Sequence, residues 1–216
     1  MRENIITYKR SLYDKYRREI KFDILFGTTT SILLVILAVI VFIGNFLLVK
    51  VYIQGSSMYP TLQNGEVVML NTYRAPNYGD IIVISGEKAD EGYWLIKRAI
   101  AFGGDTVKIE GGYVFLQKSG ETEFTKLDEP YLIKKGITYY PTIHDSRDIA
   151  PALFYLKEDE VFYLGDNRTN SRDSRSDFGT CKKEQIVGVV SEFSLKTKGI
   201  NTFFGKIVSF INNLFG

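Results

Sequence analysis

The chain has 216 residues, with 27 lysines and arginines against 25 aspartates and glutamates, so its net charge of +2 gives no general reason to expect nucleic-acid binding. Hydrophobic residues make up 45% and charged residues 24%, which is a globular composition rather than a disordered or fibrous one. The single cysteine, Cys181, excludes an intrachain disulfide, and with the single histidine, His144, it excludes multi-cysteine and multi-histidine metal sites. The sequence indicates no metal and no other cofactor.

Residues 24–49 form a run of 26 positions without a charged side chain. At a rise of about 1.5 Å per residue, such a helix exceeds the roughly 30 Å hydrocarbon core of a bilayer, so we expect a transmembrane helix. The alternative is a cleaved signal peptide, which the 23 preceding residues and the lack of a small-residue cleavage motif disfavour. Seven basic residues precede position 24, so residues 1–23 are expected in the cytoplasm and the chain from Lys50 onward outside.

Residues 50–198 are expected to form an extracytoplasmic domain of antiparallel β-strands. Short segments rich in β-branched and aromatic residues alternate with turn signals such as Gln63-Asn64-Gly65. No long helical pattern interrupts them, which favours a mainly β fold over a βαβ fold. Residues 119–156 are less patterned and are expected to be an irregular excursion. The expected strands are residues 50–54, 66–70, 80–84, 93–100, 106–109, 113–117, 160–164 and 186–193.

Residues 199–216 are expected to form an amphipathic C-terminal helix. Their apolar side chains recur at helical spacing, at Phe203, Phe204, Ile207, Val208, Ile211, Leu214 and Phe215. The helix could pack on the β domain or lie on the outer leaflet of the membrane, and the sequence does not choose between the two.

Two short segments carry side chains suited to nucleophilic chemistry. A serine in the glycine-led, proline-closed turn of residues 55–62 can present its hydroxyl and its own backbone N–H to a carbonyl. In residues 94–100, strand alternation puts Lys97 and Arg98 on opposite faces, so one of them points inward if the strand is covered. An inward lysine loses solvation, which lowers its pKa and frees the amine to act as a base. The alternative is that both side chains reach solvent.

A third segment, residues 164–179, is dense in polar side chains and follows a strand directly. Asp173 and Arg175 have opposite charges and can pair there. Such a composition is typical of a solvated polar loop, but loops that leave a core strand are also where function is often found.

Together these segments resemble the motifs of the type I signal peptidases. The resemblance rests on Gly55-Ser-Ser-Met-Tyr-Pro-Thr-Leu62, Leu95-Ile-Lys-Arg-Ala-Ile100 and Gly165-Asp-Asn-Arg-Thr-Asn-Ser-Arg-Asp-Ser-Arg175, in this order and spacing, after an N-terminal anchor. The single anchor and the short chain are similar to the Gram-positive form of the family. The resemblance implies an all-β catalytic domain and an endopeptidase that removes signal peptides from exported preproteins at the outer face of the cytoplasmic membrane.

The resemblance also implies roles for particular residues. Ser57 matches the family's nucleophile and Lys97 its general base. Ser171 matches the serine that hydrogen-bonds the lysine amine and aims it. Asp173 and Arg175 match an acid–base pair that shapes the loop near the active site. The implied partners are signal-peptide-bearing preproteins and membrane lipid, without nucleic acid, and the sequence does not indicate an oligomeric state.

Several alternatives to this interpretation stay open. A histidine base would have to be His144, which lies in a proline-flanked, poorly patterned region, whereas a serine–lysine arrangement needs no third acid. The chain could be an inactive relative that assists the assembly of surface structures, although such relatives lack the serine or the lysine. It could be a soluble, self-cleaving repressor-type protease, which the anchor disfavours. It could also be a membrane-tethered β domain without activity.

Overall fold

The computed structural model describes residues 2–46, 49–85, 94–140 and 151–215. His144, the candidate histidine base, lies outside these described residues. The chain divides into two compact units, Met1–Leu47 and Leu48–Gly216.

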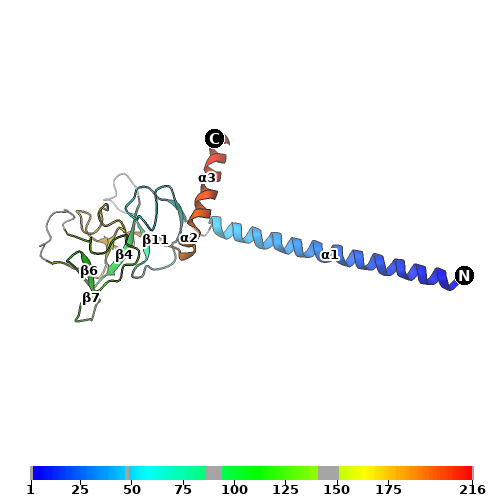
Figure 1. Cartoon of the computed structure of the whole chain (residues 1–216), viewed down its shortest axis with the longest axis horizontal. Helices are drawn as coiled ribbons and strands as arrows, with labels where there is room; N and C mark the ends of the chain where they lie inside the picture. Colours follow the sequence, from blue (N-terminus) through cyan, green and yellow to red (C-terminus); the bar gives the residue numbers. More distant parts are fainter. Residues whose placement is uncertain (1, 47–48, 86–93, 141–150, 216) are drawn as a thin grey trace. The chain divides into compact units, whose positions relative to one another are not determined.

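The first unit is a single helix, α1 (Arg2–Phe46), drawn in blue in Figure 1. Among the described residues it contains the one stretch, Lys15–Val39, that is long and apolar enough to cross a membrane. The hydroxyls near its middle each donate to a backbone carbonyl about one turn earlier, which satisfies their polar groups inside an apolar segment; they belong to Thr28, Thr29, Thr30 and Ser31. The helix ends at Phe46, before the end of the expected span, because Val49 already pairs with Leu70 in a sheet.

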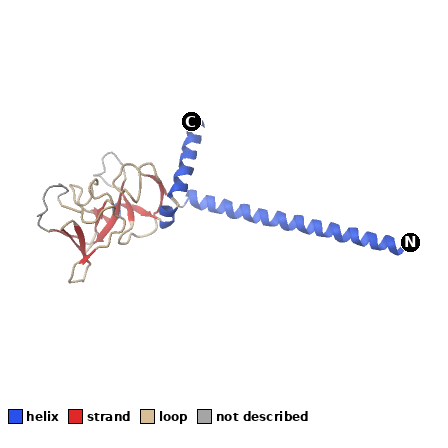
Figure 2. Ribbon diagram, viewed as in Figure 1, coloured by secondary structure: helices blue, strands red, loops and turns tan. Residues whose placement is uncertain are grey.

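The second unit contains two antiparallel sheets, whose strands are red in Figure 2. One has seven strands in the order β1-β2-β11-β3-β4-β9-β10, and the other has four in the order β7-β6-β5-β8. The strands are β1 (Val49–Tyr52), β2 (Val67–Asn71), β3 (Ile81–Ile84), β4 (Leu95–Phe102), β5 (Thr106–Glu110), β6 (Tyr113–Gln117), β7 (Thr125–Lys126), β8 (Ala152–Tyr155), β9 (Glu160–Leu164), β10 (Cys181–Lys182) and β11 (Ile186–Val190).

The mainly antiparallel β fold expected from the sequence is confirmed, and each expected strand has a counterpart. Three strands were not expected. Two of them, β7 and β10, are only two residues long, which is too short for a recognisable alternation. The third, β8, pairs with β5 at the edge of the smaller sheet, so the expected excursion at residues 119–156 is wrong at its C-terminal end.

The core explains why the two sheets stay together. One buried apolar cluster joins β4 and β9 of the larger sheet to β5 and β6 of the smaller one, and includes Ile100, Val107, Val114, Phe162 and Leu164. A second cluster includes Met58 and Leu62 with Val68, Leu70 and Ile96, so it anchors the turn at residues 55–62 to the larger sheet. Strands β3 and β4 lie inside that sheet and are buried along most of their length on both faces.

Two helices follow the last strand (Figure 1). Helix α2 (Glu192–Lys196) begins where Ser191 accepts a hydrogen bond from the backbone N–H of Ser194, so the expected strand at residues 186–193 ends earlier, at Val190. Helix α3 (Lys198–Phe215) occupies the C-terminal segment.

The first turns of α3 contact the β domain. The Thr202 hydroxyl accepts a hydrogen bond from the backbone N–H of Val67 in β2. The Lys198 amine donates to the carbonyl of Thr61 at 2.8 Å and pairs with Glu66 at 3.1 Å. This part of the helix therefore packs on the domain, while the amphipathic character of the whole helix stays a prediction.

Candidate active site

Ser57 lies in a turn that the surrounding chain holds in place. Gly55 has a φ of +86°, a left-handed conformation that favours glycine, and its N–H donates to Asn64 Oδ1 at 2.9 Å. The bonds inside the turn run from Tyr59 N–H to the Ser56 carbonyl and from Leu62 N–H to the Met58 carbonyl. The N–H of Ser57 takes part in neither bond, so it is free of the turn's own hydrogen bonding.

Lys97 lies in the middle of β4, and only 4% of its surface is exposed. Its Nζ donates to Ser57 Oγ at 2.9 Å and to the backbone carbonyl of Ile96 at 2.9 Å. Burial lowers the pKa of Lys97 to about 8, although the negative charges of Asp173 and Asp166 act in the opposite direction. The structure therefore brings a serine hydroxyl and a readily neutralised amine within hydrogen-bonding distance.

Arg98 is buried as well, with 8% of its surface exposed, so the alternative in which both basic side chains reach solvent is wrong. Its guanidinium makes two hydrogen bonds to Asp166, at 2.8 and 2.6 Å, and lies 3.8 Å from the centre of the Tyr131 ring. Strand alternation correctly predicts that Lys97 and Arg98 lie on opposite faces of β4. It does not show that both faces of β4 are covered, because that depends on loops that are distant in the sequence.

The polar segment at residues 165–179, which we call the GDN loop, contacts the Ser57 turn directly. The Asn167 N–H donates to the Ser57 carbonyl at 2.9 Å, and the Asn167 side-chain amide donates to the Ser56 carbonyl at 3.1 Å. A Cβ added at Gly165 would lie 2.2 Å from Ser171 Oγ and 2.6 Å from the Ser57 carbonyl oxygen. Only glycine at this position allows the loop to come so close to the turn.

Asp173 and Arg175 form a buried ion pair within the GDN loop. Arg175 Nε lies 2.9 Å from Asp173 Oδ1, and Arg175 Nη2 donates to Asp173 Oδ2 at 2.9 Å. The same Oδ2 accepts a hydrogen bond from the N–H of Gly165 at 3.0 Å. The segment is therefore not a simple solvated loop, since its charges are paired inside the protein.

Ser171 differs from what the resemblance implies. Its Oγ is buried but has no hydrogen-bond partner among the described residues, so the expected bond to the Lys97 amine is not formed in this structure. The amine instead uses the Ile96 carbonyl and Ser57 Oγ. The Ser171 side chain lies beside Gly165, on the same side as the Ser57 carbonyl.

Other nucleophiles and metal chemistry have less support in the described part of the chain. Cys181 is buried, and burial raises the pKa of its thiol to about 12, so it stays protonated and unreactive. Among the described residues, no group of three or more histidine, cysteine, aspartate or glutamate side chains could hold a metal ion.

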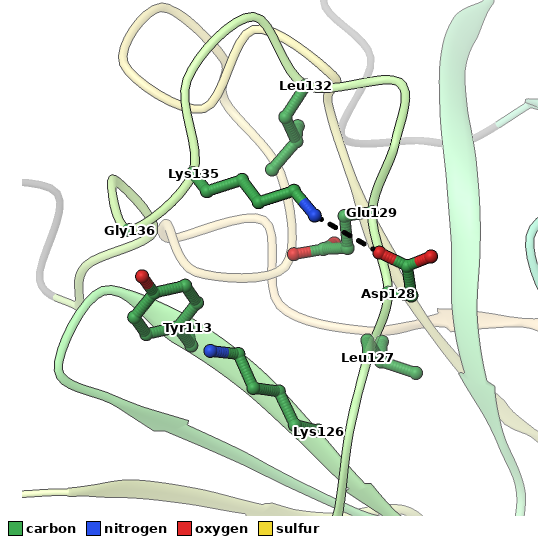
Figure 3. A pocket seen from close by; sticks show the side chains of 8 residues that line it. All are labelled: Tyr113, Lys126, Leu127, Asp128, Glu129, Leu132, Lys135 and Gly136. Carbon is green, nitrogen blue, oxygen red and sulfur yellow. Dashed lines mark hydrogen bonds and ion pairs between the residues drawn. The ribbon is translucent and has the colours of Figure 1, made fainter.

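A cavity of about 230 Å³ lies away from Ser57 and Lys97. Its lining, shown in Figure 3, consists of Tyr113, Lys126, Leu127, Asp128, Glu129, Leu132, Lys135 and Gly136. Neither Ser57 nor Lys97 borders it, so this cavity is not formed by the serine–lysine pair.

Sequence reasoning missed residues 129–139 as part of the site. Glu129 and Thr138 both hydrogen-bond Arg168, and Tyr131 covers Arg98. The only signal in the sequence is an acidic residue and an aromatic residue on either side of Pro130, which is too common a pattern to predict such contacts.

Several known proteins are similar to this chain in sequence. A family model described as signal peptidase, peptidase S26, matches residues 26–194. Signal peptidase I S of Bacillus subtilis (strain 168) is 35% identical over 174 residues, which cover 78% of this chain and 87% of the relative. Signal peptidase IB of Staphylococcus aureus (strain N315) is 34% identical over 165 residues, which cover 71% of this chain and 81% of the relative. The chain therefore belongs to the signal peptidase family, peptidase S26, and this membership indicates a peptidase.

A solved structure is also similar to the chain. It is the crystal structure of a signal peptidase I from Enterococcus faecalis V583, which is 24% identical in sequence. The superposition has a TM-score of 0.41 and covers 55% of this chain and 98% of the other.

Proposed function

We propose that this protein is an endopeptidase that removes N-terminal signal peptides from exported preproteins, with Ser57 as nucleophile and Lys97 as general base. The observation that carries the proposal is the 2.9 Å contact between Lys97 Nζ and Ser57 Oγ. A buried amine whose pKa falls to about 8 is neutral in a substantial fraction of molecules near that pH, so it can accept the proton of a serine hydroxyl.

In the first half of the reaction, Ser57 Oγ attacks the carbonyl carbon of the scissile peptide bond while its proton passes to Lys97 Nζ. The negative charge that develops on the carbonyl oxygen is stabilised by the Ser57 N–H, which the turn leaves available. When the peptide bond breaks, the Lys97 ammonium returns the proton to the leaving amine. The mature protein departs, and the signal peptide remains as an ester on Ser57.

In the second half, Lys97 is neutral again and accepts a proton from a water molecule that attacks the ester. The proton then passes from Lys97 to Ser57 Oγ as the ester bond breaks and releases the signal peptide. A substrate segment could reach the serine by adding as an extended strand to an exposed sheet edge, which gives affinity through backbone hydrogen bonds.

We further propose that α1 anchors the enzyme in the cytoplasmic membrane, with residues 1–23 in the cytoplasm. The expected span of residues 24–49 then ends by Phe46, where α1 ends, and the extracytoplasmic catalytic domain of residues 50–198 also includes Val49, the first residue of β1. Residues 199–216 would form the amphipathic C-terminal helix. Seven basic residues lie before position 24, and Lys50 is the only one between 49 and 73, which favours this orientation. Ser57 follows the span by only a few residues, where a membrane-embedded signal peptide presents its cleavage site.

The orientation predicts which part of the chain a protease can reach. Protease added to cells stripped of their wall but otherwise intact should degrade the chain beyond Lys50 and leave a protected N-terminal fragment. As a control, the same protease added after lysis should also degrade residues 1–23. Full protection of the catalytic domain until lysis would contradict the proposed orientation.

The proposed activity is tested by incubating the detergent-solubilised protein with an exported preprotein. The wild type should release a product shortened by its signal peptide, and Ser57→Ala should release none above the uncatalysed background. Mass spectrometry of the product locates the cleaved bond. Cleavage by Ser57→Ala at the wild-type rate would contradict the assignment of the nucleophile.

A further inference from the structure

Three buried arginines near the site share one neighbour, the segment of residues 129–139. Arg98 lies against the ring of Tyr131. Arg168 hydrogen-bonds Glu129 and Thr138. Arg175 Nη1 donates to a backbone carbonyl at the end of the segment, that of Tyr139. A stretch of chain without regular structure thus contacts Arg98, which is next to Lys97 in β4, and both Arg168 and Arg175 of the GDN loop.

The bond between Glu129 and Arg168 is the centre of this contact. Both side chains are buried, and the two nitrogens at the end of the Arg168 guanidinium face the two oxygens of the Glu129 carboxylate. Thr138 Oγ1 accepts a further bond from Arg168 at 2.6 Å. Burial alone would lower the pKa of Arg168, but the bonds and charge of Glu129 raise it overall, so the guanidinium stays charged.

Arg168 also makes hydrogen bonds to other residues of the GDN loop. Its Nε donates to the carbonyl of Gly165 at 3.0 Å, and its own carbonyl accepts a bond from Arg175 at 2.8 Å. Arg175 in turn forms an ion pair with Asp173, whose carboxylate accepts a hydrogen bond from the N–H of Gly165. These hydrogen bonds and ion pairs therefore connect Glu129 to the part of the GDN loop that packs against the Ser57 turn, and they hold that part in place.

Charge pairing makes Glu129 distinct from the other acids of the site. Asp166 pairs with Arg98, and Asp173 pairs with Arg175. Both of these carboxylates belong to the GDN loop itself. Arg168 belongs to the same loop, but its ion-pair partner comes from outside the loop, 39 positions earlier in the chain. Glu129 also borders the cavity of Figure 3, next to the exposed Asp128 and Lys135.

From this arrangement we propose that Glu129 is a positioning residue: through Arg168 it holds the GDN loop against the Ser57 turn and so keeps the Lys97 amine buried and in line with Ser57. The proposal rests on the proposed function of the serine–lysine pair. Glu129 itself takes part in no proton transfer. Its loss should therefore alter the environment of Lys97 and the rate of the chemical step rather than the binding of substrate.

The test is the Glu129→Gln variant of the full chain, with cleavage rates expressed per folded enzyme from near-ultraviolet circular dichroism. Glutamine keeps the shape but removes the charge, so Arg168 loses its counter-charge and the loop loosens. We expect kcat to fall by about ten- to hundredfold, because small misplacements of reacting groups cost this much, while KM changes little. Water should then reach the amine and raise its pKa, so the rise of activity with pH should move above the pH of about 8 that we expect for the wild type.

Three further variants control the result. Asp128→Asn makes the same charge change one residue earlier, at an exposed pair with Lys135, and should leave kcat and the pH profile unchanged. Glu129→Asp keeps the charge and should recover part of the lost rate. Thr138→Val removes another side-chain acceptor of Arg168 without a change of charge, so it should shift kcat and the pH profile in the same direction by a smaller amount.

The outcomes separate this proposal from the proposed function. If the wild type does not cleave a preprotein, the proposed function fails. If the wild type cleaves and Glu129→Gln has the wild-type kcat and pH profile per folded molecule, Glu129 supports stability alone and the inference is overturned. If Glu129→Gln does not fold, Thr138→Val decides: an unshifted kcat and pH profile in that variant would equally overturn it.

Discussion

Replacing Lys97 with arginine should abolish cleavage as completely as replacing it with alanine. Arginine keeps the positive charge, but its guanidinium does not lose a proton at any pH that proteins tolerate, so it cannot accept the proton of Ser57. Loss of the base from a serine–base pair typically costs about 10³- to 10⁶-fold in the chemical step. Single-turnover cleavage of a preprotein by Lys97→Arg, Lys97→Ala and the wild type measures this directly. An arginine variant with much of the wild-type rate would instead indicate a purely electrostatic role for the side chain.

The pH dependence provides a second measurement of the same assignment. Burial lowers the pKa of Lys97 to about 8, and only the neutral amine accepts a proton, so wild-type activity should rise with pH through about 8 and then level off. His144→Ala is the matched control, since a histidine base would place the rise near 6.5. That variant should keep the wild-type rate and profile. An inactive but folded His144→Ala enzyme would restore histidine as the base.

The second large effect concerns stability. Asp173→Asn should lower the free energy of unfolding by about 3–5 kcal/mol, because it leaves the buried guanidinium of Arg175 without its counter-charge. Asparagine can still accept the bond from Gly165 N–H, so most of the loss comes from the unpaired charge. For a domain of this size the midpoint of thermal unfolding should fall by about 10 °C. Near-ultraviolet circular dichroism of the full chain during heating measures the shift.

The same loop offers a control for this variant. Asp177 pairs with Arg172 at 3.1 Å, but both side chains are mostly exposed. Exposed pairs contribute little, so Asp177→Asn should change the free energy of unfolding by less than about 1 kcal/mol. Equal shifts in the two variants would show that burial of the Asp173–Arg175 pair does not set its contribution.

Much of this fold could be predicted from the sequence because its signals are local. The uncharged run of residues 24–49 predicts an apolar helix, and alternating β-branched segments predict β2 through β6 and β9 closely. Strand alternation also predicts that Lys97 and Arg98 lie on opposite faces of β4. These features depend on neighbouring residues, so one stretch of sequence contains the information.

The features that could not be predicted depend on contacts between distant segments. Arg98 is buried because Asp166 and Tyr131 neutralise and cover it, and neither residue is close to it in sequence. Glu129 lies in a stretch without periodicity, so nothing local indicates that its carboxylate meets Arg168. The orientation of Ser171 depends on how closely Gly165 approaches Ser57, a distance that loop composition does not report.

The contact between Lys198 and Thr61 has a consequence for the order in which the active site assembles. Thr61 follows Ser57 in the same turn, and its hydroxyl donates to Asp166, 105 residues later in the chain, while its carbonyl accepts from Lys198, 137 residues later. Ser57, the proposed nucleophile, is thus made early during synthesis, and the groups that fix its turn are made late. Such long sequence separations slow folding. A nascent chain therefore carries an unsupported serine until nearly all of the domain has emerged, and proteolytic activity should begin only with the complete domain.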